Sequence, residues 1–249
     1  MDNNNQNQIF GINVVENTGT HTVSKNFVAN VFLWMFLALG ISSAVAFYFS
    51  MNADILIQYL IKEEGGLNML GWGVMLAPLG FVFLMSLGFA RLSAPAITGL
   101  FFLYATINGI SFSFILLAYT ATSVVGCFLS AAAMFGLMAV MGYTTDKDLT
   151  GFGRLMTMGL IGILIAMLIN FFMESNMMDY IISIIGVMVF TGLTAYDVQK
   201  LKRIGAGIEF EGTDAAQVKK LSIMGALSLY LDFVNIFLFL LRLFGGRRD

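Results

Sequence analysis

Long stretches without a charged side chain determine what this chain can fold into. The longest runs from Leu92 to Thr145, 54 residues, and two others cover Asn26–Ala53 and Gly65–Ala90. A helix that spans a bilayer needs about 20 predominantly apolar residues, so the longest stretch is too long for one span. We expect it to hold two helices with a turn at Ala118–Ser123. The pattern predicts an all-α, polytopic membrane protein.

The remaining uncharged stretches bring the expected number of spans to seven. Leu155–Met173 forms a fifth span, and Tyr180–Tyr196 forms a sixth that ends at Asp197. The last stretch, Leu221–Leu241, is interrupted by Asp232, and neither half is long enough to span alone. A seventh span therefore requires an aspartate inside the membrane. The alternative is a re-entrant hairpin at the C-terminus, whose irregular backbone must be buried in protein.

Composition agrees with a lipid environment and excludes several classes of function. Hydrophobic residues make up 58% of the chain and charged residues 11%, against about 45–50% and 25% in soluble domains. The net charge of −2 and the lack of a basic tract with aromatics argue against a nucleic-acid partner. Cys127 is the only cysteine, so no intrachain disulfide forms. His21 is the only histidine and precedes the first span, so the spans contain no imidazole.

The N-terminal part predicts the domain organisation and the orientation. Residues 1–25 are polar and lack the pattern of a cleavable signal peptide, so we expect a disordered, cytoplasmic tail. A single transmembrane domain is expected over 26–245, followed by a short tail over 246–249. Nine of the 13 Lys and Arg residues fall on the side of this N-terminal tail, which predicts a cytoplasmic N-terminus in the plasma or inner membrane. Arg242, Arg247 and Arg248 fall on the other side and argue for the re-entrant alternative.

Asp232 is the first candidate functional residue, because it lies near the middle of the expected seventh span. A charged side chain there costs about 2.5–3.5 kcal/mol on insertion scales, and such residues usually mark a functional site. Ser228 at i−4 and Asn235 at i+3 share its helix face. The spacing predicts a polar seam inside the bundle.

Asp197 and Arg91 are the other candidates. Asp197 closes the sixth span, with Thr194 on the same helix face, and the seventh span starts from the same side of the membrane. We therefore expect the carboxylates of Asp197 and Asp232 to meet, with Arg91, at the end of the second span, as their counter-ion. The charged residues of the neighbouring loops are expected to be solvated: Asp146, Lys147, Asp148, Lys200, Lys202 and Arg203.

Two carboxyl groups that lie close together titrate as a coupled unit, so this pair is a candidate pH sensor. Carboxylates are also hard oxygen ligands, compatible with transient contact of Asp197 and Asp232 with calcium. No permanent metal site and no cofactor are expected.

Three segments carry a resemblance to a known family. Thr191–Gln199, Ala226–Arg242 and Asn108–Ser111 closely resemble the Bax inhibitor-1 family, also called the transmembrane Bax inhibitor motif family. The resemblance implies six helices around a central seventh and a pH-sensitive calcium leak. It also implies that Asp197 and Asp232 form a di-aspartyl sensor, with Arg91 as its partner and Asn108 in support. A loop over about Lys200–Lys220 is expected to be longer than in compact bacterial relatives.

Three functions remain in competition. The first is a cation leak gated by the aspartates, and the second is a stress-response protein that binds a membrane protease or another membrane protein. The third is an intramembrane aspartyl protease, but the sequence before Asp232 is Leu229-Tyr-Leu and not the Gly-x-Gly that such enzymes need. We therefore expect no enzymatic activity.

Overall fold

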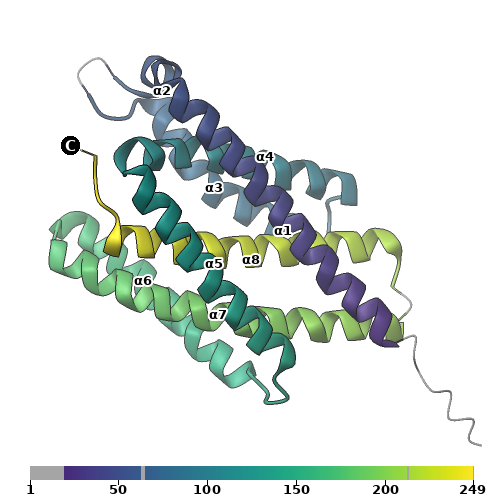
Figure 1. Ribbon diagram of the computed structural model, residues 1–249. Helices are drawn as coiled ribbons and strands as arrows, with labels where there is room; N and C mark the ends of the chain where they lie inside the picture. Colours follow the sequence, from purple (N-terminus) through teal and green to yellow (C-terminus); the bar gives the residue numbers. More distant parts are fainter. Residues whose placement is uncertain (1–19, 63–64, 212, 249) are drawn as a thin grey trace, which may run out of the picture.

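The computed structural model describes residues 20–62, 65–211 and 213–248, and within these the side chains of residues 20–25 and 209–211 are left undescribed. The tail predicted over 1–25 therefore lies largely outside the described residues. The described part contains eight helices and no strand. Their bounds are α1 Thr20–Met51, α2 Ala53–Leu60, α3 Met69–Gly88, α4 Ala94–Ala118, α5 Ala121–Thr144, α6 Thr150–Met173, α7 Asn176–Glu211 and α8 Ala215–Phe244 (Figure 1).

All described helices except α2 are long and apolar enough to cross a membrane, so the prediction of seven spans is confirmed. The 54-residue uncharged stretch divides where expected, with α4 ending at Ala118 and α5 beginning at Ala121. Thr120 caps α5, because its side chain accepts a hydrogen bond from the backbone of Ser123. Hydroxyl caps of this kind satisfy backbone donors at helix ends, which lipid cannot do.

Helix α8 forms the centre of the bundle (Figure 1). It packs against α1, α3, α4, α5 and α7. Of the most apolar 18-residue stretch of α8, 72% is buried, compared with 11% for α3 and for α6, which face the surroundings. The prediction of a central seventh helix is therefore confirmed.

One alternative and one expectation about the C-terminal third are wrong. Helix α8 runs without a break through Asp232, so the structure contains no re-entrant hairpin among residues 215–244. The long loop expected over Lys200–Lys220 is also absent, because α7 continues to Glu211 and α8 begins at Ala215. The extension of α7 is helical because Leu201 and Ile208 recur on one face and are buried, which stabilises an amphipathic helix beyond the apolar span.

Helix α2 is an element that the uncharged stretches did not predict. It is a short helix between the first two spans, and Leu56 and Leu60 on one of its faces are buried. Asn68 then fixes the start of α3: its side chain accepts a hydrogen bond from the Gly71 backbone and donates one to the Tyr59 carbonyl. The α1–α3 connection is thus held against the bundle.

Glycines permit the closest helix crossings around α7. A Cβ atom at Gly142 of α5 would collide with the backbone carbonyl of Ala195. A Cβ at Gly153 of α6 would collide with the ring of Tyr196. Small residues let transmembrane helices approach to this degree. Both crossings involve residues directly before Asp197, so they fix the position of that residue relative to α5 and α6.

Candidate carboxylate site between α7 and α8

Asp232 is buried in the middle of α8, with 4% of its surface exposed. Its Oδ2 atom has no hydrogen-bond partner within the described part of the chain. Buried polar atoms almost always have such a partner, and an isolated one is costly. An orphaned carboxylate oxygen at the most buried helix of the bundle is therefore a feature that packing alone does not explain.

Asp197 lies on α7, half-buried, and lines a pocket of about 190 Å³ between α7 and α8. Ser228 of α8 lines the same pocket and interacts with the Asp197 carboxylate. The carboxylate of Asp197 is also close enough to that of Asp232 for the two to interact electrostatically. The α7–α8 interface thus holds three of the residues singled out in the sequence.

Lys200 is the cation that faces this site. It lies one turn after Asp197 on α7, lines the same pocket and interacts electrostatically with that carboxylate. Its side chain is exposed, so the pocket has a solvent-accessible, positively charged edge. Lys200 is exposed, as expected, but it lies on α7 and not in a loop, and its relation to Asp197 is not evident from the sequence.

Arg91 does not join the two carboxylates. It lies exposed in the turn between α3 and α4 and forms no ion pair with any described residue. The same turn is nevertheless fixed beside α8, because the Lys220 ammonium lies 4.7 Å from the centre of the Phe89 ring. Arg91 is therefore at the end of the bundle where α8 begins, without touching the aspartates.

The other members of the predicted polar seam bond to their own helices. Thr194 donates to the Phe190 carbonyl at 2.8 Å, Asn235 to the Leu231 carbonyl at 2.7 Å, and Asn108 to the Tyr104 carbonyl at 3.3 Å. These bonds satisfy polar groups inside a helix bundle without linking one helix to another. Of the predicted supporting residues, Ser228 is the one placed against a carboxylate.

The loop between α5 and α6 anchors α7 just beyond Asp197. The Gln199 side chain accepts a hydrogen bond from the Leu149 backbone and donates one to the Lys147 carbonyl. Arg203 forms an ion pair of 2.6 Å with Asp148. Hydrogen bonds from Thr150 and from Arg203 hold the pKa of Asp148 below its usual range. Asp148 and Arg203 are both exposed, as expected, and the ion pair between them is a feature that the sequence did not predict.

A second polar cluster, missed in the sequence, involves Tyr230, two residues before Asp232 on α8. Tyr230 of α8 and Tyr104 of α4 stack edge to face, with ring centres 5.4 Å apart, and both are fully buried. The Tyr230 hydroxyl lies 2.8 Å from that of Ser42 on α1. A tyrosine within an apolar span signals such a cluster, because its hydroxyl needs a partner when buried. The sequence gives no means of identifying that partner.

The described residues contain no group of three or more His, Cys, Asp or Glu side chains that could hold a metal ion. Two carboxylates at one interface can instead exchange protons and make transient contacts with a cation.

These features define a polytopic α-helical membrane protein with carboxylates at the interface of its central helix. Residues 24–249 match the model of a family described as "Inhibitor of apoptosis-promoting Bax1". The chain therefore belongs to the Bax inhibitor-1, or transmembrane Bax inhibitor motif, family, as its motifs predicted.

Bacterial relatives match over almost the whole chain. "Inner membrane protein YbhL" of Escherichia coli K12 is 42% identical over 90% of this chain and 93% of its own length. "Uncharacterized protein RP147" of Rickettsia prowazekii is 39% identical over 90% of this chain and 91% of its own length. "Uncharacterized membrane protein SpyM3_0260" of Streptococcus pyogenes is 38% identical over 90% of this chain and 94% of its own length. Two of these three names describe membrane proteins, in agreement with the seven apolar helices of this chain.

Proposed function

We propose that this protein is a pH-sensitive cation leak channel of the cell membrane, with calcium as its permeant ion. The proposal places the N-terminus in the cytoplasm, where most Lys and Arg residues of the loops then lie. In a bacterial cell this membrane is the inner membrane, in agreement with the name of the Escherichia coli relative.

The observation that carries the proposal is the unpaired Oδ2 of Asp232 beside the carboxylate of Asp197. When both groups are ionised, like charges repel across the α7–α8 interface, and a single bound proton removes that repulsion. Helices α7 and α8 thus have two preferred spacings, set by protonation. Ion conduction along this interface is then expected to follow pH.

Arg91 has a place in this proposal as a partner for the carboxylates in a second conformation. Its turn already lies beside α8 through the Phe89–Lys220 contact, and α3 is largely exposed, so its movement disrupts little packing. Pairing with Arg91 would neutralise one carboxylate without a proton.

The test is calcium flux into liposomes containing the purified protein, measured over a pH series. Wild-type protein is expected to conduct with a pH dependence that Asp232→Asn removes. Asp214→Asn, a matched change at an exposed residue before α8, is expected to leave the profile unchanged. Equal flux and equal pH dependence in wild type and Asp232→Asn would refute the proposal.

A second candidate function is the binding of a membrane protease or another membrane protein in a stress response. Helix α7 has 36 residues, about 54 Å at 1.5 Å per residue, whereas the hydrocarbon core is about 30 Å thick. Its last turns therefore project from the bilayer, where a partner has access to them. Stable co-purification of one membrane protein, unaffected by Asp232→Asn, with no flux at any pH, would favour this function. We propose no enzymatic activity for either case.

A further inference from the structure

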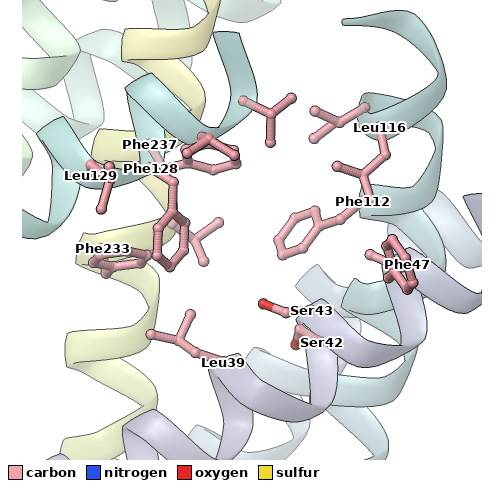
Figure 2. A pocket seen from close by; sticks show the side chains of 15 residues that line it. Leu39, Ser42, Ser43, Phe47, Phe112, Leu116, Phe128, Leu129, Phe233 and Phe237 are labelled. Atoms are coloured by element: carbon pink, nitrogen blue, oxygen red, sulfur yellow. The ribbon is translucent and has the colours of Figure 1, made fainter. Parts of the chain in front are cut away.

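An apolar pocket of about 390 Å³ lies between α1, α4, α5 and α8, away from the carboxylate site. Figure 2 shows aromatic rings of α5 and α8 along one side and Phe112 with Leu116 along the other. Ser42 and Ser43 are its polar side chains, and Ser42 is already bonded to the Ala105 carbonyl. An apolar cavity of about 150 Å³ already holds benzene in place of water, so this larger space suits a hydrocarbon.

The pocket opens sideways toward the bilayer. Helices α4 and α5 follow each other in the chain but hardly touch within the described residues, so their splayed spans leave the opening between them. Val125 and Leu129 of α5 and Phe47 of α1 line the pocket with exposed side chains. In a membrane the medium at this opening is lipid tail, which enters an apolar space without a desolvation cost.

The residues after α8 form a strap across the outer ends of α4 and α5. Gly246 bonds through both of its backbone groups: its carbonyl accepts from the Thr120 backbone at 3.0 Å, and its N–H donates to Ser123 Oγ at 2.9 Å. The Arg248 backbone donates to the Ala118 carbonyl at 2.9 Å. The strap, residues 245–248, is thereby fixed at the level where three spans end.

Arg248 places a positive charge at the mouth of the pocket. Its Nη1 atom lies 3.5 Å from the carbonyl oxygen of Leu116, whose side chain lines the pocket. Arg247, its neighbour, is held beside Tyr119 by a backbone bridge. Both arginines are exposed, and neither forms an ion pair with a described residue.

We propose that one anionic phospholipid binds here, with an acyl chain in the pocket and its phosphate group on Arg248 and Arg247. A guanidinium binds phosphate through two parallel hydrogen bonds, which makes arginine the fitting residue for a headgroup. The apolar walls and the charged mouth match the two parts of a lipid molecule. Its tail would lie toward the membrane centre and its phosphate at the membrane surface. The site is separate from the proposed ion path.

The lipid also accounts for basic residues on the face of the protein that is otherwise poor in them. Arg247 and Arg248 lie on the side opposite to most Lys and Arg residues. The distribution of loop charges does not explain why these two arginines lie on this side. Binding of a phosphate, with their backbone held by hydrogen bonds, would explain it.

Native mass spectrometry of the purified full-length protein tests the proposal, with added phosphatidylglycerol or phosphatidylcholine as the probe. Wild type is expected to retain one phosphatidylglycerol about tenfold more tightly than phosphatidylcholine. Both lipids carry the phosphate, but the choline cation of phosphatidylcholine is repelled by the two arginines, whereas phosphatidylglycerol has a net negative charge. Ser43→Phe and Val125→Phe fill the pocket from two helices and are expected to abolish retention of both lipids. Arg248→Gln is expected to equalise the two lipids.

Matched controls separate the site from general effects of the changes. Ser130→Phe places the same ring on an exposed part of α5 outside the pocket, and Lys62→Gln removes a charge on the same face of the protein. Both are expected to bind lipid as wild type does. Undiminished retention in both pocket-filling variants, with melting temperatures equal to that of wild type, would overturn the proposal. So would equal affinity of the wild type for the two lipids.

Discussion

The Tyr230 hydroxyl on α8 donates a hydrogen bond to Ser42 Oγ on α1, with the two oxygens 2.8 Å apart. The direction follows because Ser42 has one proton to donate and gives it to the Ala105 carbonyl at 2.7 Å. One chain of hydrogen bonds therefore runs from the central helix through α1 to α4. All of it is buried, where hydrogen bonds are not exchanged with water.

Tyr230→Phe is expected to lower the free energy of unfolding by about 0.5–1.5 kcal/mol, the usual net contribution of such a bond. Unfolding by sodium dodecyl sulfate in mixed micelles measures the change. Tyr180→Phe on α7 is the matched control, because Tyr180 is 57% exposed. Equal stability of the two variants would show that the Ser42 bond contributes nothing.

Gly142→Ala is expected to destabilise the protein by about 1–3 kcal/mol, the range for overpacking a tight contact. The added Cβ meets the rigid carbonyl of Ala195, so α5 and α7 must separate. Gly136→Ala in the same helix has open space around its Cβ, and there helix propensity favours alanine by about 1 kcal/mol. The thermal midpoints of the two variants should therefore shift in opposite directions.

The Asp148–Arg203 ion pair is expected to stabilise the protein in a pH-dependent manner. The pKa of Asp148 is lowered on folding, so its contribution is complete above the unfolded value of about 3.9 and is lost as the pH falls below it. The melting temperature of wild type should exceed that of Asp148→Asn from neutral pH to about pH 5, with the difference shrinking below about pH 4. Asp146→Asn in the same loop should match wild type throughout. A difference that grows on acidification would contradict the assigned ion pair.

Asp232→Leu is expected to raise the free energy of unfolding by about 1–3 kcal/mol, because it removes a buried oxygen that has no hydrogen bond. The same change at Asp179 of α7 should lower stability, since that carboxylate accepts a hydrogen bond from Asn170 at 2.8 Å and lies 3.6 Å from Arg242. Denaturant titration of both variants measures whether each change raises or lowers the free energy of unfolding. A loss of stability in Asp232→Leu would mean that the Asp232 carboxylate stabilises the folded protein.

The spans were predictable because the bilayer imposes a simple rule on the sequence. A charge-free run such as Leu92–Thr145 must cross the membrane, and its hydroxyl residues mark the turn. The same rule gives no information where the chain leaves the lipid. The last turns of α7 are helical because Leu201 and Ile208 pack on the bundle, which is a tertiary effect.

The site was predictable only in part, for a related reason. Asp232 and Ser228 lie one helical turn apart, so periodicity places them on one face. The position of Arg91 depends instead on how far α3 stands from α8, which no local pattern encodes. The partner of Tyr230 is 188 residues away and required the folded structure.

The central position of α8 sets an order of assembly during synthesis. Ribosomes release the chain from its N-terminus, so α1 to α7 reach the membrane before the helix at the centre of the bundle. Until α8 arrives, the faces of α1, α4, α5 and α7 that contact it have only lipid or each other as neighbours. The native bundle therefore closes late, and a ribosome that stalls before α8 leaves an open ring of helices exposed to the membrane's quality-control proteases.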